Sequence, residues 1–163
     1  AHAIISCQGA QMALGETDLL QQGFAPVKGE VIRVKLDTPL EKECIHQKHF
    51  MLSEGNNEVT VGATYAWDGF SDGPTQEKKN ELEEHVSKVW NGSTRTVDHK
   101  SGVRPATKDR RPMVGPHTLA HTWIFGGMGS RAVLMAPYLA KVLVEHFMYG
   151  TDLLAECLPS RFS

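Results

Sequence analysis

Alternating apolar and polar positions in the first part of the chain predict β-strands. From Glu30, the run EVIRVKLD places Ile32, Val34 and Leu36 on one face and charged residues on the other, which indicates a half-buried strand. Two further strand-like runs, residues 43–52 and 59–65, flank SEGNNE and predict an antiparallel hairpin.

Two other segments follow helical spacing. Thr75 is a suitable N-cap, and apolar residues recur after it at i, i+4, i+7 and i+8, namely Leu82, Val86, Val89 and Trp90. Residues 132–149 are apolar on nearly every side and end before Gly150, a natural C-cap. We expect this second helix to be buried, because a helix that is hydrophobic all round belongs in a core.

One segment is not typical of regular structure. GVRPATKDRRPMVGPH, residues 102–117, combines four cationic side chains with three prolines, so it cannot lie flat in a central strand or continue a helix. Strand-like TRTV precedes it and HTWIF follows it, while IISC near the start predicts a buried strand that ends at Gly9. With residues 12–22 as a helical or irregular connection, the pattern indicates an α+β fold, a mostly antiparallel sheet with flanking helices.

Composition and charge narrow the class of protein. The 163 residues are 40% hydrophobic and 22% charged, which is typical of a globular protein. A net charge of -2 argues against a general nucleic-acid binder. The three cysteines are far apart in sequence, so we expect reduced, cytoplasmic thiols and neither disulfides nor a metal site. The abrupt apolar start, AHAIISCQGA, favours a piece of a longer protein.

The stretch after HTWIF contains a glycine loop. Residues 127–132, GMGSRA, match the dinucleotide fingerprint G-x-G-x-x-[G/A] between a predicted strand and a predicted helix. No strand-like run follows that helix, so the sequence does not support a self-contained Rossmann unit. Two interpretations stay open: the glycines allow close approach of a ligand to a helix N-terminus, or they only permit a tight turn.

The order of several motifs carries a resemblance to a known family. KGE at residues 28–30, VGAT at 61–64, GVRPATKDRRPMVG and GGMGSRAVLMAP resemble the C-terminal half of the D-amino-acid-oxidase-like, glycine oxidase-like FAD-dependent oxidoreductases. The resemblance implies FAD as cofactor and hydride transfer to the flavin from a carbon that bears an amine. It also implies that the N-terminal FAD-binding portion is missing. Residues 1–22 and 117–163 would be pieces of the FAD-binding domain, and residues 23–116 would form the substrate-binding sheet.

The resemblance also implies roles for individual residues. Arg104 stands where the family has the arginine that pairs with the substrate carboxylate, and Phe50 where glycine oxidase has a substrate-contacting tyrosine. Gly9 ends a strand near the cofactor. The segment along the flavin comprises Gly127, Met128, Gly129, Ser130, Arg131, Ala132 and Val133, with alanine at position 132 where the family more often has glycine. From the residues alone, Arg104 could instead form a structural salt bridge.

Two alternatives to a small-molecule amine or amino-acid oxidoreductase remain. Three segments, GMGSR, LPSRF and the RDRRPMVG-like sequence KDRRPMVG, are similar to the oxidase half of the bifunctional tRNA wobble-uridine-modifying enzyme. In that case Lys108, Arg110 and Arg111 would meet tRNA phosphates; otherwise Arg110 and Arg111 face solvent, and Asp109 closes the turn. The third possibility is a non-catalytic binding fragment, because the cofactor site is incomplete.

Overall fold

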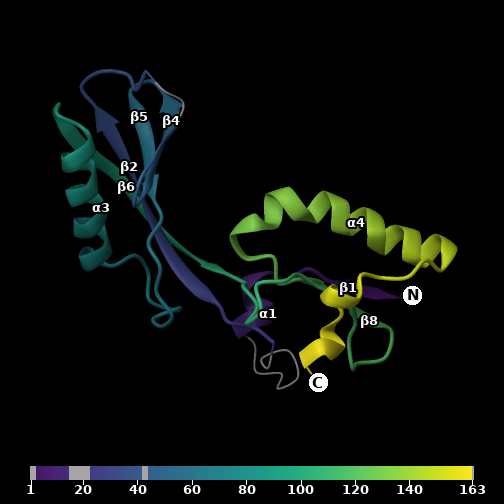
Figure 1. The fold of residues 1–163 in the computed structure, drawn as a ribbon. Helices are drawn as coiled ribbons and strands as arrows, with labels where there is room; N and C mark the ends of the chain where they lie inside the picture. The colour runs from purple at the N-terminus through teal and green to yellow at the C-terminus, as the bar shows by residue number, and fades with distance from the viewer. Residues whose placement is uncertain (1–2, 15–22, 42–43, 163) are drawn as a thin grey trace. The chain divides into compact units, whose positions relative to one another are not determined.

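The chain forms two compact units. The computed structural model describes residues 3–14, 23–41 and 44–162, and it divides into unit 1, Ala1–Val27 with Arg104–Ser163, and unit 2, Lys28–Val103 (Figure 1). The expected connection at residues 12–22 is described only as far as Leu14, and the rest of it lies outside the described residues. Each unit has its own core and is treated separately below.

A five-stranded sheet forms unit 2. Its order is β3-β4-β5-β2-β6, with bounds β2 Val27–Leu36, β3 Cys44–His46, β4 Phe50–Gly55, β5 Glu58–Gly62 and β6 Thr94–Arg104. The expected hairpin is confirmed as β4 and β5, which pair antiparallel. Its first strand is shorter than expected, because the run 43–52 breaks into two antiparallel partners, β3 and β4. The segment after TRTV also continues as strand, so β6 extends to Arg104 at the edge of the sheet.

Helix α3, Gln76–Val89, covers one face of this sheet, as Figure 1 shows. Thr75 is the N-cap, and its side chain accepts a hydrogen bond from the Lys78 backbone N–H. The core combines Leu82 and Val86 of the helix with alternate residues of the strands: Ile32, Val34, Leu36, Met51, Val59 and Val61. The predicted alternation in β2 and the predicted helical stripe are therefore both confirmed.

A buried carboxylate connects the sheet to the start of α3. Glu30 is 2% exposed and accepts hydrogen bonds from the backbone N–H and the hydroxyl of Thr75, at 2.9 and 3.1 Å. Nε2 of His99 lies 2.8 Å from the same carboxylate, and Nζ of Lys28 lies 3.6 Å from it. A buried charge needs such partners, so the KGE motif has a structural role in placing the helix.

Unit 1 has a small sheet with long-range connections. Strand β1, Ile4–Ser6, pairs in parallel with β8, Thr122–Gly126, and β8 pairs antiparallel with β7, Met113–Pro116. The helical elements are α1 Ala10–Leu14, η1 Gly129–Arg131, α4 Ala132–Tyr149, η2 Ala155–Cys157 and η3 Pro159–Phe162. Two apolar clusters fill the unit, one around Ile124 and Met113, the other around Val114 and Leu139.

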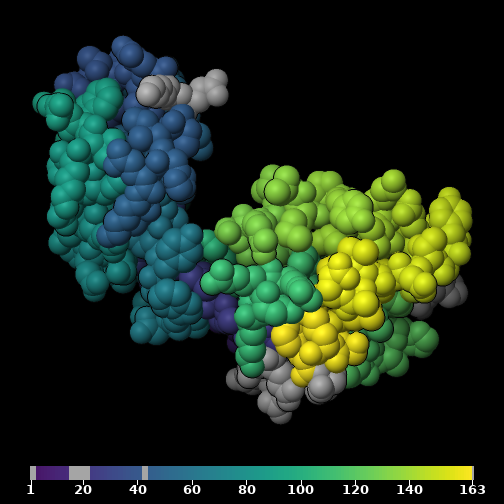
Figure 2. Space-filling view, in the orientation of Figure 1, coloured from purple at the N-terminus to yellow at the C-terminus, as the bar shows by residue number. Residues whose placement is uncertain are grey.

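The expected burial of the last helix is wrong for this chain. Helix α4 has the expected bounds, and Gly150 is its left-handed C-cap, but only Leu139 and Leu143 are buried. Val133 is 92% exposed and Leu134 81%, because unit 1 supplies packing partners to one side of the helix only. The space-filling view shows the yellow-green surface of α4 uncovered within its unit (Figure 2). No helix among the described residues is long and apolar enough to cross a bilayer.

The ion pairs of α3 generate a pH prediction. The hydrogen bond from Lys48, together with that from Lys78, lowers the pKa of Glu81 from 4.5 to about 2. The ionised carboxylate therefore contributes stability that is complete above pH 4.5 and is lost as the pH falls toward 2. In Glu81→Gln we expect the free energy of unfolding, measured with urea, to fall less steeply between these pH values. Glu54→Gln is the control, since Glu54 is exposed and has no partner in the described part of the chain; an unchanged slope in Glu81→Gln would refute the prediction.

Candidate functional site

Two glycine turns lie at one edge of the parallel strand pair. Ser6 of β1 pairs in register with Ile124 of β8, and Gly9 and Gly127 each follow three residues later. Both glycines have a positive φ, +57° and +70° respectively. Because ligands of α/β sheets bind beyond the carboxyl ends of parallel strands, this edge is the candidate site.

The glycine loop is shaped by a close backbone approach. A Cβ on Gly127 would lie 2.7 Å from Cγ2 of Thr107 and 3.0 Å from the backbone nitrogen of Met113. Among the described residues, no atom beyond the two chain neighbours lies within 4 Å of a Cβ placed on Gly9, so its backbone conformation is what requires a glycine. Gly127 therefore has a packing role inside unit 1, while the space beside Gly9 is open.

The residues predicted to lie along the flavin differ in what they expose. Met128 is 7% exposed and packs in the core beside Val114 and Leu139, so a ligand could reach only its backbone. Ser130, Arg131 and Val133 are exposed and Ala132 is half-buried. The loop thus presents backbone and the side chains of Ser130, Arg131 and Val133 around the start of α4, while the N–H groups of Gly129 and Arg131 donate to the Pro105 and Met128 carbonyls. This arrangement fits a planar or phosphate-bearing group such as FAD.

Backbone contacts just after Arg104 hold its segment against the glycine loop. Arg104 ends β6, and two residues later Ala106 forms an isolated antiparallel bridge with Met128. The Gly129 backbone N–H donates to the Pro105 carbonyl at 3.3 Å. Arg104 is half-buried. A candidate carboxylate-binding residue and a candidate cofactor loop are therefore neighbours in unit 1, although more than 20 residues separate them in sequence.

The other charged residues of this segment differ in their contacts. Lys108, Arg110 and Arg111 have exposed side chains, which agrees with the solvent-facing interpretation of Arg110 and Arg111. Asp109 closes the turn as expected, since its Oδ1 accepts from the Arg111 N–H at 3.1 Å. The guanidinium of Arg161 also binds this carboxylate and holds the pKa of Asp109 well below its usual range. The sequence analysis missed Arg161 as a partner, because 52 residues separate it from Asp109.

Phe50 lies in unit 2, on the face of the sheet opposite α3. Its neighbour Met51 packs under α3, so the alternation of a strand directs Phe50 the other way. Gly62 pairs with both Phe50 and Val31 in the sheet register, which makes these three residues neighbours across the strands. Phe50 itself is half-buried.

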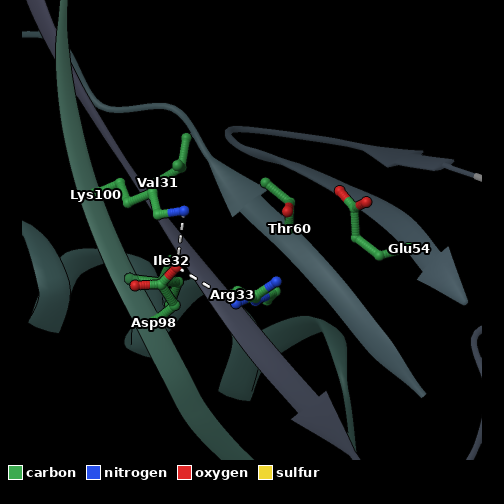
Figure 3. Close-up of a pocket in the computed structure, with 7 residues that line it drawn as sticks. All are labelled: Val31, Ile32, Arg33, Glu54, Thr60, Asp98 and Lys100. Carbon is green, nitrogen blue, oxygen red and sulfur yellow. Dashed lines mark hydrogen bonds and ion pairs between the residues drawn. The ribbon is translucent and has the colours of Figure 1, made fainter. Parts of the chain in front are cut away.

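The same face carries a small charged hollow of about 140 Å³ (Figure 3). Asp98 forms ion pairs with Arg33 at 3.5 Å and with Lys100 at 3.1 Å. Thr60 and Glu54 line the opposite side of the hollow. Ligand pockets usually enclose about 300–1,000 Å³. The hollow is therefore too small to be a substrate site by itself, and its charges neutralise one another.

The fingerprint GMGSRA does not form a complete dinucleotide-binding unit in the described chain. Helix α4 is followed by the short 3-10 turns η2 and η3, and a second strand parallel to β8 after the helix is absent from the described residues. The expectation against a self-contained Rossmann unit is confirmed. In residues 3–14, 23–41 and 44–162, no three His, Cys, Asp or Glu side chains are grouped to hold a metal ion.

Comparison with known proteins identifies the family. A family model described as FAD dependent oxidoreductase matches residues 1–146. The chain belongs to this family. Its cofactor is accordingly FAD, and the residues at the carboxyl edge of β1 and β8 fit that group.

Individual relatives agree with the family. Glycine oxidase from Bacillus subtilis (strain 168) is 28% identical over 136 residues, which cover 79% of this chain and 36% of that protein. Iminodiacetate oxidase from Chelativorans sp. BNC1 has a similar fold, with a TM-score of 0.79 and 24% identity over 98% of this chain and 46% of the other. For glycine oxidase from Geobacillus kaustophilus the TM-score is 0.72 at 24% identity, covering 94% and 43%. The chain thus spans less than half the length of these relatives.

The glycine loop generates a matched pair of substitutions. Gly127 and Gly150 have the same φ of +70°, but in the part of the chain that the structure describes no atom lies within 4 Å of a Cβ on Gly150. Gly150→Ala should cost about 1–2 kcal/mol in free energy of unfolding, for the left-handed conformation alone. Gly127→Ala should cost about 1–3 kcal/mol more, because its methyl group meets Thr107 and Met113. Equal losses in urea unfolding would show that the close approach does not constrain the loop.

Proposed function

We propose that this chain is the substrate-binding sheet and the C-terminal pieces of the FAD-binding domain of an oxidoreductase. The sheet of unit 2, Lys28–Val103, would form the former and unit 1 the latter. The sequence alone places this boundary at residues 23 and 116, but residues 104–116 lie in unit 1, where β7 pairs with β8. The whole enzyme oxidises the C–N bond of an amino acid or a secondary amine. The observation that carries the proposal is the pairing of the Arg104 segment with the glycine loop, at residues Ala106 and Met128.

Bound FAD supplies the hydride acceptor, and the chain supplies binding and orientation. Arg104 presents a planar guanidinium, which holds a carboxylate by two parallel hydrogen bonds. A substrate fixed at its carboxylate has its α-carbon at a defined position, and geometry of this kind provides much of the rate of a transfer reaction. The substrate loses a hydride from carbon and a proton from nitrogen, which leaves an imine.

The remaining site residues act through backbone and shape. The N-terminus of α4, at Ala132 and Val133, carries a partial positive charge that stabilises an anion nearby. Gly9, Gly129 and Ser130 allow the cofactor to approach the backbone closely. Gly127 contributes indirectly, because its packing against Thr107 and Met113 shapes the loop. Phe50 offers the substrate a ring without a hydroxyl, so its side chain can donate no hydrogen bond to a carboxylate.

Arg104 provides the direct test of this function. In the complete protein with FAD, we expect amino acids or secondary amines to reduce the flavin in a stopped-flow measurement. Arg104→Lys should raise the substrate concentration for half-maximal reduction at least about tenfold, because a charged hydrogen-bonded contact contributes roughly 1.5–3 kcal/mol. The control Arg95→Gln, at an exposed residue of β6, should behave as wild type. If Arg104→Lys leaves both affinity and reduction rate unchanged, the carboxylate role is wrong.

The same experiment includes a second substrate, a carboxymethylaminomethyl group on a tRNA wobble uridine. That group has a carboxylate for Arg104 and the same kind of C–N bond, and the exposed Lys108, Arg110 and Arg111 suit phosphates. Reduction of the flavin by modified tRNA, and not by free amines, would favour this alternative.

The uncovered apolar side of α4 supports a missing FAD-binding portion as partner. Leu134, Tyr138 and Val144 are 81%, 60% and 58% exposed, and Ile4 of the edge strand β1 is 59% exposed. Parallel sheets are normally covered on both faces, and large exposed apolar patches mark interaction sites. We therefore assign the side of α4 that includes Leu134 to the contact with that portion.

A charged side chain placed on this side of α4 should lower the free energy of unfolding only when the FAD-binding portion is present. Leu134→Glu should lower the free energy of unfolding of the complete protein by about 2 kcal/mol or more, because it buries an unpaired carboxylate. In the 163-residue chain alone the change should stay within about 0.5 kcal/mol. The matched control is Leu119→Glu, at a loop residue that is 61% exposed, which should be neutral in both proteins. A neutral Leu134→Glu in the complete protein would rule out this contact.

A further inference from the structure

The turn from Thr107 to Arg111 is held by an arginine near the C-terminus. Arg161 of η3 donates from Nε to Asp109 Oδ2 at 2.7 Å and from Nη2 to Asp109 Oδ1 at 3.1 Å. Its Nη2 also donates to the Arg111 carbonyl at 3.0 Å, and its Nη1 to the Leu158 carbonyl at 2.9 Å. The side chain is 14% exposed. One guanidinium therefore joins the turn to the last helical segment by three hydrogen bonds, and a fourth holds it to its own segment.

The turn is also ordered internally and from its other side. Thr107, 2% exposed, donates from its hydroxyl to the Arg111 carbonyl at 2.6 Å, and the Arg110 N–H donates to the Thr107 carbonyl at 3.1 Å. Arg131 of the glycine loop donates from Nη2 to the Arg110 carbonyl. Two arginines distant in sequence thus bind successive residues of one turn, Asp109 to Arg111.

This turn is in direct contact with the candidate site. The methyl group of Thr107 occupies the space beside Gly127 that a side chain there would need. Ala106, immediately before it, bridges to Met128, and Arg104 lies two residues earlier. A displacement of the turn would therefore move the Arg104 segment relative to the glycine loop.

Only an arginine has the geometry that Arg161 uses. Its planar fork reaches both carboxylate oxygens and a carbonyl at once, whereas a lysine is a single flexible point charge. Apolar contacts, by contrast, already anchor the C-terminal segment, since Phe162 packs against the cluster of Phe24 and Met113. Attachment of the tail therefore does not by itself require the Arg161 hydrogen bonds.

We propose that Arg161 is a positioning residue of the active site. It acts through the turn of Asp109 to Arg111, sets the position of Arg104 against Gly127–Gly129, and touches neither substrate nor cofactor. The inference rests on the proposed function, because Arg104 matters to activity only if it binds a carboxylate.

The test compares Arg161→Gln, Arg161→Lys and the milder Asp109→Asn with the control Arg95→Gln in the complete protein with FAD. The probe is acetate, a carboxylate with no C–N bond to oxidise, titrated against the flavin absorbance. We expect Arg161→Gln to raise the dissociation constant of acetate about tenfold or more, since a displaced Arg104 guanidinium can no longer align both of its hydrogen bonds with the carboxylate. Arg161→Lys should not restore the wild-type dissociation constant of acetate. Asp109→Asn should raise this constant less than Arg161→Gln does, and Arg95→Gln should match wild type.

A purely structural role predicts a different result. Arg161→Gln would then lower the melting temperature but leave acetate binding and the flavin reduction rate within twofold of wild type, and this outcome would overturn the proposal. Rescue by Arg161→Lys would overturn it as well.

Amide hydrogen exchange distinguishes a failure of this inference from a failure of the proposed function. If wild type binds no acetate and no amine reduces its flavin, the proposed function fails. Faster exchange in Arg161→Gln at both residues 105–111 and 127–131 would still support the coupling of turn and loop. Faster exchange confined to residues 155–162 would refute it.

Discussion

The absence of a side chain at Gly127 is the constraint on which the candidate site depends. The methyl group of Thr107 and the backbone of Met113 occupy the space that a Cβ would fill. Interiors are packed closely enough that even one added methyl group must displace its neighbours. The short distance lets Ala106 pair with Met128, and this pairing places Arg104 beside a loop that belongs to a different part of the chain.

Unit 2 depends on a different kind of constraint. The carboxylate of Glu30 is buried. Its hydrogen-bond partners are the backbone N–H and the hydroxyl of Thr75 and the imidazole of His99. Since an unpaired charge would be costly in that position, the start of α3 and the strand β6 must both meet β2 at this point. The KGE motif, which contributes to the family resemblance, therefore also determines how the helix is placed on the sheet.

Much of the local structure could be predicted from side-chain periodicity and from the residues that cap helices. Alternation identified the buried face of β2, and Thr75 and Gly150 marked a start and an end of helices that the structure confirms. The break between β3 and β4 was not visible in the pattern, because both flanking runs are strand-like. The burial of α4 was misjudged for a related reason: apolar residues on all sides indicate that a helix has partners, but not whether those partners lie within this chain.

The sequence by itself determined most of the elements and the family, because periodicity, capping residues and the order of motifs are local properties of the chain. It also singled out Arg104 and the glycine loop, although their roles remain proposals. Only the tertiary structure decided that these two are neighbours and that Arg161 binds the turn between them. Contacts of this kind join residues 22 and 52 positions apart, and side-chain patterns with a period of two or 3.6 residues carry no information about them.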